Sequence, residues 1–366
     1  FPPPAKVGWF PEQKSMKMKM IFVLLFIATS FAMIAFRTSN DWLFVVPRGW
    51  QKPAYNFQQN PLTKQKIELG RALFYDPILS RDGMVSCASC HSQYSAFTHG
   101  DHALSHGIHD SIGTRNAPAL MNLAWQRVFM RDGAVNHLDM QALAPIGNPA
   151  EMGETITHVV AKMQATTLYP RLFAAAFGDS AITGERTLKA IAQFMLILVS
   201  SNAKYDSVMR KQAVFSEQER KGYVLFKKHC STCHTEPLFT NNQFMNNGLP
   251  IDSTIQDLGR FGVTQNPDDS LKFAVPTLRN IEFSYPYMHD GRFKRLPDVL
   301  NHYTAIGLQN RTKSHTLAKE LQTPIALSSN DKVDLTAFLL TLTDRGFLFN
   351  PAFSFPRNIV FETAKD

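Results

Sequence analysis

All four cysteines of this chain fall in two copies of one pentapeptide. Residues 87–91 read C-A-S-C-H and residues 230–234 read C-S-T-C-H. This pattern attaches c-type haem, because two thiols three positions apart reach both vinyl groups of a porphyrin and the next histidine lies under the iron. Two C-x-x-C pairs could instead bind zinc, but zinc does not require a histidine at the same offset twice. The sequence therefore predicts two covalently bound haem c groups, with these attachment and proximal residues: Cys87, Cys90, His91, Cys230, Cys233 and His234.

The segments around the two motifs are related, which allows the two irons to be compared. The matching segments are residues 69–74 and 221–226, 118–123 and 276–281, and 129–133 and 287–291. Leu138 and Leu296 each lie five residues past the shared glycine, and seven residues further the second copy has Tyr303 where the first has Pro145. A phenolate can bind ferric iron, whereas proline has no such donor. We expect Tyr303 to bind the second iron and the first iron to stay open, although Tyr303 could also be a packed core aromatic.

Two residues near Pro145 could handle an oxygen species at an open iron. Glu151 offers a carboxylate that can move a proton between the two oxygens of a peroxide. Gln141 offers a carboxamide that can hold the peroxide by hydrogen bonds. A glutamate in a loop is more often a solvated charge, so the catalytic interpretation depends on its position beside the empty site.

The repeat indicates how the chain positions these residues. Apolar residues at three- and four-residue spacing predict helices over residues 63–74, 156–164, 186–199, 216–228 and 331–343. Thr63 and Ser216 are expected N-caps, the latter with Glu219 in a capping box. Residues 241–270 are rich in glycine, proline and asparagine and predict a long loop. We expect an all-α fold of two cytochrome c-like haem domains from an internal duplication, over residues 57–200 and 214–345, joined near residues 200–213 and followed by a tail over 346–366.

Composition and the N-terminus suggest a setting for the chain. A length of 366 residues allows two domains, and 44% hydrophobic with 19% charged residues indicates a globular protein. The net charge of +8 suits an anionic redox protein or a membrane surface, but no basic stripe for nucleic acid is present. Lys17 and Lys19 precede an apolar run over residues 20–36, which is typical of a signal peptide and could also be a short anchor or a buried helix. We expect residues 1–40 to be a leader and the protein to be exported to the periplasm, where c-type haem is attached.

The motifs together resemble those of bacterial dihaem cytochrome c peroxidases and their MauG-like relatives. The resemblance covers residues 60–343 and depends on these segments: 69–77, the two haem motifs, 115–118, 151–153, 275–280 and 285–291. It implies a periplasmic, two-domain helical protein, often a homodimer. It also implies that the first haem is the peroxide site and that the second haem receives electrons.

The resemblance also assigns individual residues. It matches the family's inter-haem calcium ligands to the Asn116 side chain and to the backbone carbonyls of Ser284 and Pro286, an oxygen-only set that suits calcium. It matches the distal glutamine and glutamate to Gln141 and Glu151. Tyr303 follows the MauG pattern, whereas ordinary peroxidases have a methionine on the second iron.

Two departures from the family pattern affect electron and ligand chemistry. The tryptophan that usually lies between the haems is replaced by Arg131, and whether the nearby Trp125 lies there is open. Peroxidases that need reductive activation have a distal histidine in the loop that corresponds to residues 99–109. His106 is the first choice for such a ligand here, although a polar loop histidine is the commoner case.

Three functions follow from these features. The first is reduction of hydrogen peroxide to water with electrons from a small cytochrome c or a cupredoxin. The second is a MauG-like enzyme that uses peroxide-derived oxidising equivalents to modify a protein or small molecule; Tyr303 favours it and Arg131 disfavours it. The third is a plain electron carrier, which Pro145 disfavours because electron carriers normally keep both axial sites filled. We expect the peroxidase.

Overall fold

The computed structural model describes residues 1–3, 43–100, 102–306 and 314–360. The predicted apolar leader over residues 20–36 lies outside the described residues. The chain divides into two compact units, Phe1–Val45 and Val46–Asp366, and the second unit contains both C-x-x-C-H motifs. In the part of the chain that the structure describes, no helix is both long and apolar enough to cross a membrane.

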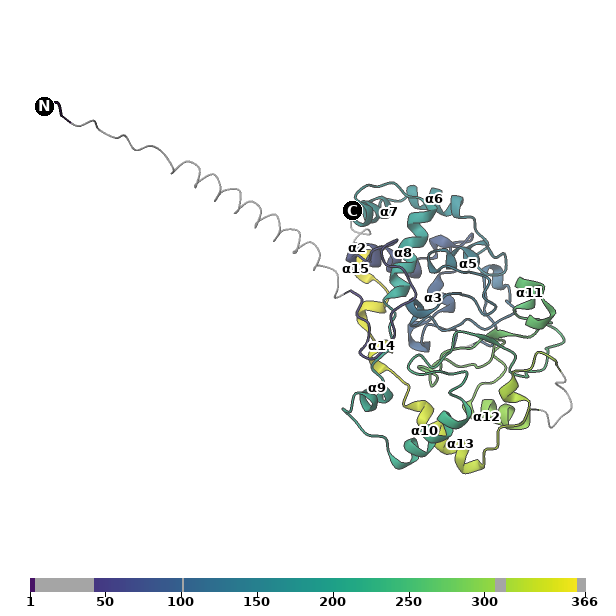
Figure 1. The fold of residues 1–366 in the computed structure, drawn as a ribbon. Helices are drawn as coiled ribbons and strands as arrows, with labels where there is room; N and C mark the ends of the chain where they lie inside the picture. Colours follow the sequence, from purple (N-terminus) through teal and green to yellow (C-terminus); the bar gives the residue numbers. More distant parts are fainter. Residues whose placement is uncertain (4–42, 101, 307–313, 361–366) are drawn as a thin grey trace. The chain divides into compact units, whose positions relative to one another are not determined.

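The first half of the second unit is built from helices that pack on one another (Figure 1). Helix α2 (Lys64–Tyr75) packs on α8 (Gly184–Leu196) and on α7 (Leu168–Phe177), and α6 (Ile156–Gln164) lies against α7 and α8. A Cβ at Gly70 would overlap the backbone of Ala190, so α2 and α8 approach as closely as helices can. This packing positions α2, which contacts the segment of the first haem motif.

The second half uses the same arrangement with α10 (Glu217–His229), α12 (Leu296–Ala305) and α13 (Ser329–Leu340). Gly222 of α10 lies against the backbone of Asp334 in α13, as Gly70 does against α8. Phe226, Phe239 and Phe338 form the centre of its core. The only sheet among the described residues pairs β1 (Phe244–Met245) with β2 (Phe273–Ala274) antiparallel. The prediction of a helix-rich chain with little sheet is confirmed.

The predicted helices are present, with shifts of up to three residues at their ends. Thr63 caps α2, and Ser216 caps α10 in a capping box in which the Ser216 N–H donates to Glu219 Oε2 over 2.7 Å. The predicted loop over residues 241–270 also contains β1 and the short helix α11 (Phe261–Thr264). Smaller helices complete the chain: α3 (Cys87–Cys90), α4 (Leu138–Gln141), α5 (Leu143–Gly147), α9 (Lys204–Met209), α14 (Arg345–Leu348) and α15 (Arg357–Val360).

The segment expected to join two domains belongs to the second half. Residues 200–213 contain α9, whose Tyr205 packs into the core with Phe239 and Phe338. Asp206 forms a buried ion pair of 2.7 Å with Arg279, which is 0% exposed. This stretch therefore packs as a structural element of the second half, and the division into two domains stays a prediction.

The two halves match in backbone conformation and contact each other through matching hydrogen bonds. Asn122 and Asn280 both have left-handed φ angles, of 57° and 56°. The Asn116 N–H donates to His289 O over 2.8 Å, and the Ala274 N–H donates to Arg131 O over 2.7 Å. These two bonds join equivalent positions of the repeat in opposite directions. The contact between the halves therefore has approximate two-fold character.

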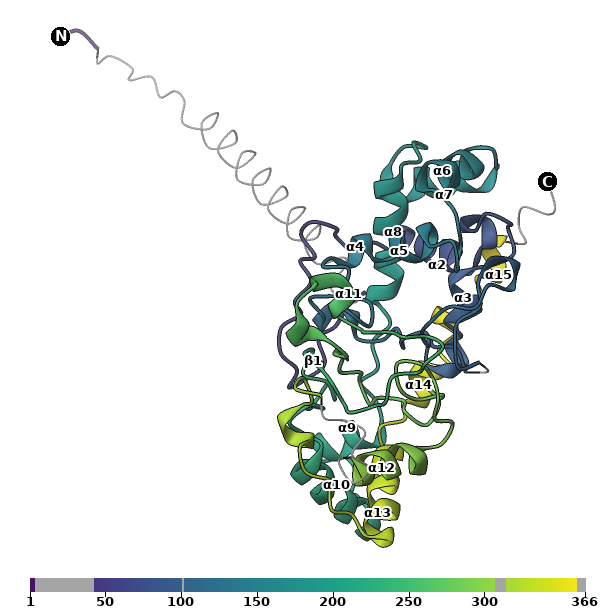
Figure 2. The ribbon, with the colours of Figure 1, turned by 90° about the vertical axis from the view of Figure 1, so that its right-hand side faces the viewer.

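The chain returns at its C-terminus to the first half. Both ribbon views place α14 and the following residues beside the first half (Figures 1 and 2). Arg71 Nε donates to Ser354 O over 2.6 Å, and the Tyr75 hydroxyl donates to Phe353 O over 2.7 Å. Phe353 is 6% exposed and packs against Phe97. Residues 346–360, which belong to the tail expected over residues 346–366, thus pack against the first half as a strap.

Candidate haem-binding active site

The first C-x-x-C-H motif forms a single helical turn. Ser86 and Ser89 cap this turn reciprocally, and Cys87 and Cys90 are three positions apart on it, so their thiols share one face. The His91 Nδ1–H donates to Phe97 O over 2.7 Å, because a carbonyl can only accept. This bond fixes the tautomer that leaves Nε2 able to bind iron. Burial lowers the pKa of His91 to about 4, which keeps the imidazole in its neutral, ligating form.

The second motif follows the C-terminal end of α10 and has the same design. His234 Nδ1 lies 3.1 Å from both Phe239 O and Pro276 O, which again leaves Nε2 for a metal. All four cysteines are free thiols. Thiol pairs with an oriented histidine beside each pair suit thioether attachment of haem c, so the residues present fit two such groups.

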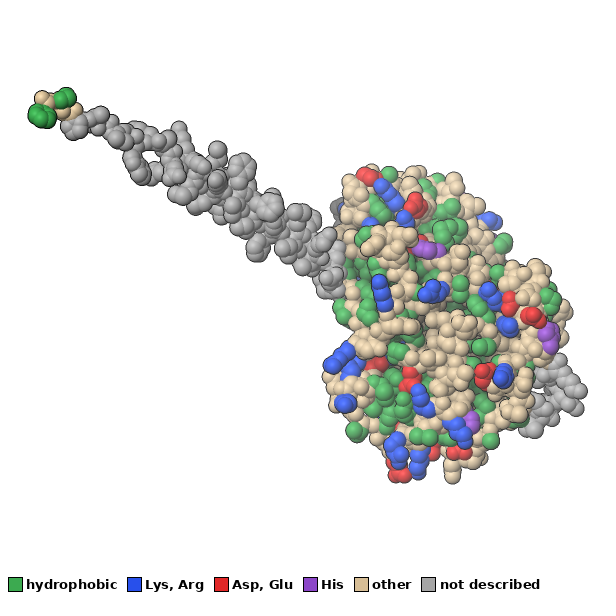
Figure 3. All heavy atoms as spheres, viewed as in Figure 1, with side chains coloured by type: hydrophobic (Ala, Val, Ile, Leu, Met, Phe, Trp, Pro, Cys, Tyr) green, Lys and Arg blue, Asp and Glu red, His purple; other side chains and the backbone are tan. Residues whose placement is uncertain are grey.

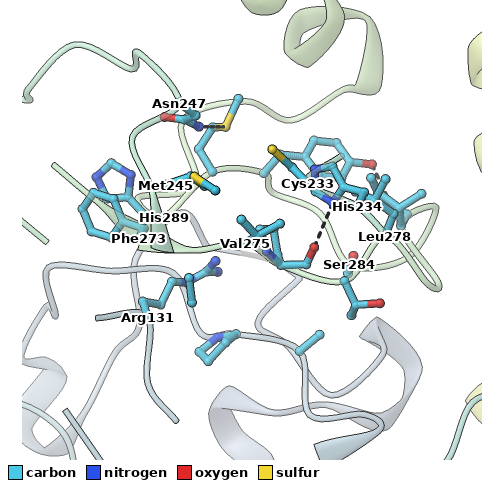
Figure 4. Close-up of a pocket in the computed structure, with 18 of the residues that line it drawn as sticks. Arg131, Cys233, His234, Met245, Asn247, Phe273, Val275, Leu278, Ser284 and His289 are labelled. Atoms are coloured by element: carbon cyan, nitrogen blue, oxygen red, sulfur yellow. Dashed lines mark hydrogen bonds between the residues drawn. The ribbon is translucent and has the colours of Figure 1, made fainter. Parts of the chain in front are cut away.

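A cavity of about 310 Å³ adjoins the second motif (Figure 4). Its walls include Cys230, Cys233, His234 and the apolar side chains of α12 and α13. Tyr303, near the end of α12, lines the same cavity. Burial raises the pKa of the Tyr303 phenol to about 12, and the Asn247 side chain opposes that rise. The structure therefore brings Tyr303 into one cavity with His234, as the sequence predicted, while its binding to iron stays a prediction.

The equivalent segment of the first half has a different helix. Leu138 and Leu296 both begin helices, which supports their alignment in the repeat. Helix α12 continues unbroken from Leu296 past Tyr303, whereas α4 ends and α5 begins around Ala142, so that Pro145 lies in α5. The first half thus presents no side-chain donor at the position of Tyr303.

Glu151 lies beside the first haem motif. The Asn148 Nδ2 amide donates to Glu151 Oε1 over 2.7 Å. Burial raises the pKa of Glu151, and the Asn148 bond acts in the opposite direction. Burial also raises the pKa of the thiols of Cys87 and Cys90, and the Glu151 charge raises them further. A partly buried carboxylate close to the attachment thiols is placed where acid–base chemistry at the first haem would need it.

Gln141 is placed differently from Glu151. Its Nε2 lies 3.6 Å from the sulfur of Met130, and its side chain lines the cavity between the halves. Within the described ranges no hydrogen bond joins Gln141 to Glu151. The two predicted distal residues are therefore not a directly bonded pair.

The predicted histidine loop forms a cluster of rings near the first motif. The ring centroids of His99 and His102 are 4.9 Å apart, and those of His102 and His106 are 4.6 Å apart. His106 O lies 3.5 Å from Cys90 Sγ, but the His106 ring bonds Asp110, with Nδ1 2.7 Å from Oδ1. No set of three or more His, Cys, Asp or Glu side chains among residues 43–100, 102–306 and 314–360 is arranged to hold a metal ion. A blocking role for His106 stays a prediction.

One of the predicted calcium ligands, Asn116, is bonded by a guanidinium. Asn116, Ser284 and Pro286 all line the cavity, together with Arg131. Arg131 Nη2 donates to Asn116 Oδ1 over 3.1 Å, and this is the oxygen that calcium would use. Figure 4 shows the guanidinium directed into the cavity toward Val275. These residues do not fit calcium as the resemblance implied, because a cationic side chain already occupies its ligand.

Several residues around the site were not found from the sequence. Asn148 is bonded to Glu151, and Asn247 donates to the sulfur of Met288 over 3.4 Å. Asn148 lies three residues before Glu151, a turn spacing that could have drawn attention to it. Asn247 lies in the long loop, and no pattern in that loop predicts where its side chain points.

Comparison with known proteins places the chain in a family. The family model described as di-haem cytochrome c peroxidase matches residues 64–214. The methylamine utilization protein MauG of Methylophilus methylotrophus is 34% identical over 290 residues, which cover 77% of this chain and 84% of that protein. The chain belongs to the family of di-haem cytochrome c peroxidases and MauG proteins.

Members of both kinds resemble this chain. Cytochrome c551 peroxidase of Nitrosomonas europaea is 33% identical over 289 residues, which cover 77% of this chain and 81% of that protein. The solved structure of a MauG-like protein associated with microbial copper homeostasis has a TM-score of 0.76 at 32% identity, covering 86% of this chain and 99% of that chain. Membership of the family supports two haem c groups and a peroxidase-type oxidoreductase, which confirms these predictions.

Proposed function

We propose that this protein reduces hydrogen peroxide to water at its first haem, with electrons that a small cytochrome c or cupredoxin delivers through the second. The observation that carries the proposal is the difference between the halves. The second half places Tyr303 in the cavity of His234. The first half has Pro145 at the equivalent position and the partly buried Glu151 beside its attachment thiols. With haem bound, Tyr303 would close the second iron site, and the first would stay open to a small molecule.

The reaction consumes one hydrogen peroxide, two electrons and two protons and yields two waters. The haem, when bound, supplies the redox-active iron. Glu151 accepts the proton of one peroxide oxygen and returns it to the other, which makes the departing oxygen a better leaving group. Because burial raises its pKa, the carboxyl group can hold the proton between the two transfers. Gln141, whose side chain lines the cavity between the halves, would offer amide hydrogen bonds to the peroxide.

A MauG-like oxidation of a protein or other substrate is the second candidate. Tyr303 favours it, because an anionic oxygen ligand should stabilise a more oxidised iron than a thioether does. Arg131 speaks against the usual electron route through a tryptophan between the haems. Peroxide reduction therefore remains the first candidate.

Steady-state turnover distinguishes the two candidates. Purified holoprotein would be mixed with peroxide and a reduced small cytochrome, with and without prior half-reduction of the two haems. We expect cytochrome oxidation in a two-to-one ratio to peroxide consumed. If peroxide oxidises the haems but the cytochrome is not consumed, the MauG-like function is favoured. A requirement for half-reduction would support a blocking ligand such as His106.

The setting of the protein is part of the proposal. We propose export to the periplasm under direction of residues 1–40, as a cleaved signal or as a short anchor, and assembly as a homodimer. The matching hydrogen bonds of the two halves support an origin by internal duplication. On the face seen in Figure 3, basic and acidic side chains are interspersed, so this face offers no single-sign patch to a redox partner.

A further inference from the structure

Arg131 lies at the contact between the two halves, where both its backbone and its side chain form hydrogen bonds. Its backbone carbonyl accepts from the Ala274 N–H over 2.7 Å, which joins it to the second half. Its side chain forms two hydrogen bonds with Asn116. The Nε–H donates to the Asn116 backbone carbonyl over 3.0 Å, and Nη2 donates to Asn116 Oδ1 over 3.1 Å. Asn116 is itself bonded to the second half through His289 O, over 2.8 Å. The guanidinium thus sits on the residue at which the two halves meet.

Arg131 binds one of the three residues that the family resemblance assigns to calcium. Its two hydrogen bonds go to neutral oxygens of Asn116. Ser284 and Pro286, which the family resemblance assigns as carbonyl ligands of calcium, line the same cavity. Calcium binds six to eight oxygens at about 2.3–2.6 Å. An ion at that distance from Asn116 Oδ1 would lie against the guanidinium, and the two positive charges would repel each other.

The nearby carboxylates are already paired with other arginines. Arg115 Nη1 lies 2.6 Å from Asp132 Oδ2 and its Nε lies 2.5 Å from Asp257 Oδ2. Asp290 is bonded by Arg292, with Nε 2.8 Å from Oδ2. No ion pair of Arg131 is found in the part of the chain that the structure describes. Arg115 and Arg292 carry two positive charges against the three charges of Asp132, Asp257 and Asp290. Arg131, which feels the charge of Asp290, supplies the third positive charge, so no net negative charge is left to receive a divalent cation as well.

We propose that the Arg131 guanidinium is a built-in cation that takes the place of an inter-haem calcium ion, so that this protein holds its two halves together without calcium. Burial lowers the pKa of Arg131 to about 10, which still leaves the side chain charged at neutral pH. The replacement also explains why the residue departs from the family's tryptophan. The guanidinium donates to two oxygens at once, whereas a tryptophan side chain has a single N–H donor. The inference concerns assembly and metal content and does not depend on which substrate is oxidised.

Metal analysis and unfolding test this inference on the holoprotein. Protein purified in buffer with calcium chloride and then desalted should contain two irons and well under one calcium per chain. Treatment with EGTA should leave the thermal unfolding midpoint and the haem spectra unchanged. The variant Arg131→Met should unfold at a lower temperature, and millimolar calcium, but not magnesium, should restore the midpoint. Arg131→Lys keeps a cation in the cavity and should stay insensitive to calcium.

The exposed Arg127 gives a matched control, because Arg127→Met removes a charge four residues away without touching Asn116. It should unfold as the wild type does, with or without calcium. One calcium per wild-type chain, with a midpoint that falls on chelation, would overturn the proposal. So would Arg131→Met with an unchanged midpoint, or with a lowered midpoint that calcium does not raise. Should Arg131→Met not fold, the wild-type metal content and Arg131→Lys still decide the matter.

Discussion

Tyr303 and Pro145 differ in whether the side chain can bind a haem iron. The two positions lie seven residues after Leu138 and Leu296, which both begin helices. Only the Tyr303 side chain carries an oxygen, and Tyr303 lines the cavity of His234. An uncoordinated phenol with a pKa of about 12 would stay protonated at neutral pH. Binding to ferric iron supplies the positive charge that makes the phenolate stable.

The variant Tyr303→Met therefore tests the ligand directly. We expect the second haem to change to histidine–methionine ligation, with a higher reduction potential, because a neutral thioether stabilises the ferric state less than a phenolate. Spectroelectrochemical titration would measure the two potentials separately. An unchanged spectrum and potential would mean that Tyr303 only packs in the core.

Glu151 carries the proton transfer in the proposed reaction. Glu151→Gln keeps the shape and can still bond Asn148, but it cannot carry a proton. Positioned acid–base groups contribute about 10²- to 10⁴-fold, so peroxide turnover should fall by that factor while both haems stay attached and reducible. Near-normal turnover in this variant would direct attention to the histidines of residues 99–109.

Asn148 gives a pH-dependent test of the same site. Its bond favours the carboxylate form and lowers the pKa of Glu151 against the effect of burial. In Asn148→Ala that pKa should rise, because only the raising effect of burial remains. If the carboxylate must accept the first proton, the acidic limb of the turnover profile moves to higher pH. The limb should be absent from Glu151→Gln; a limb that stays in place in Asn148→Ala would show that another group titrates.

Single residues with a chemical signature were the part of the site that could be predicted. Each C-x-x-C-H motif identifies its haem-attachment cysteines and its proximal histidine within five residues, and the repeat aligns Tyr303 with Pro145. The side chains that orient the site carry no such signature. The contact of Arg131 with Asn116 depends on how the two halves meet, which no local pattern encodes.

The helices follow from local patterns, because apolar spacing and capping residues act over a few positions. Thr63 and Ser216 begin α2 and α10 as their side chains predict. Helix α9, within residues 200–213, was not predicted, because it has only six residues and depends on the tertiary ion pair of Asp206 with Arg279. Short elements that depend on residues distant in the sequence cannot be predicted from the spacing of apolar residues.

The close contact of α2 with α8 predicts a sharp effect of a small change. In Gly70→Ala the new methyl group would meet the backbone of Ala190, which cannot rotate away. The helices must separate, and overpacking of this kind costs about 1–3 kcal/mol or more. Gly147→Ala is the matched control, because nothing lies within 4 Å of its added Cβ. Equal unfolding midpoints for the two variants would show that α2 and α8 are not in close contact.

The C-terminal strap connects the second half to the first half. The strap leaves the second half after α13 and binds the first half through Arg71 and Tyr75. Gln93, two residues after the first haem ligand, donates to Asn350 O over 2.8 Å. The end of the chain thus supports the elements around the first haem. This link could not be predicted, because residues 346–360 show no repeat or periodic pattern.

The strap yields a prediction for the entire molecule. Phe353 is 6% exposed and packs against Phe97 and Phe347, so Phe353→Ala leaves a cavity beside the first haem motif. Truncation of a buried phenylalanine typically costs about 3–5 kcal/mol of unfolding free energy. Phe349→Ala is the control, because Phe349 is 51% exposed and its loss should cost far less. Denaturant unfolding would be followed by the Soret absorbance of each haem.

Because Phe97 O accepts the hydrogen bond that orients His91, loosening of the strap should reach the first haem before the second. We expect the first haem of Phe353→Ala to lose its native ligation at a lower denaturant concentration, while the second follows the wild-type curve more closely. Loss of both signals together at one lowered midpoint would show that the halves unfold as a single unit. An unchanged midpoint would mean that the strap contributes no stability to the peroxide site.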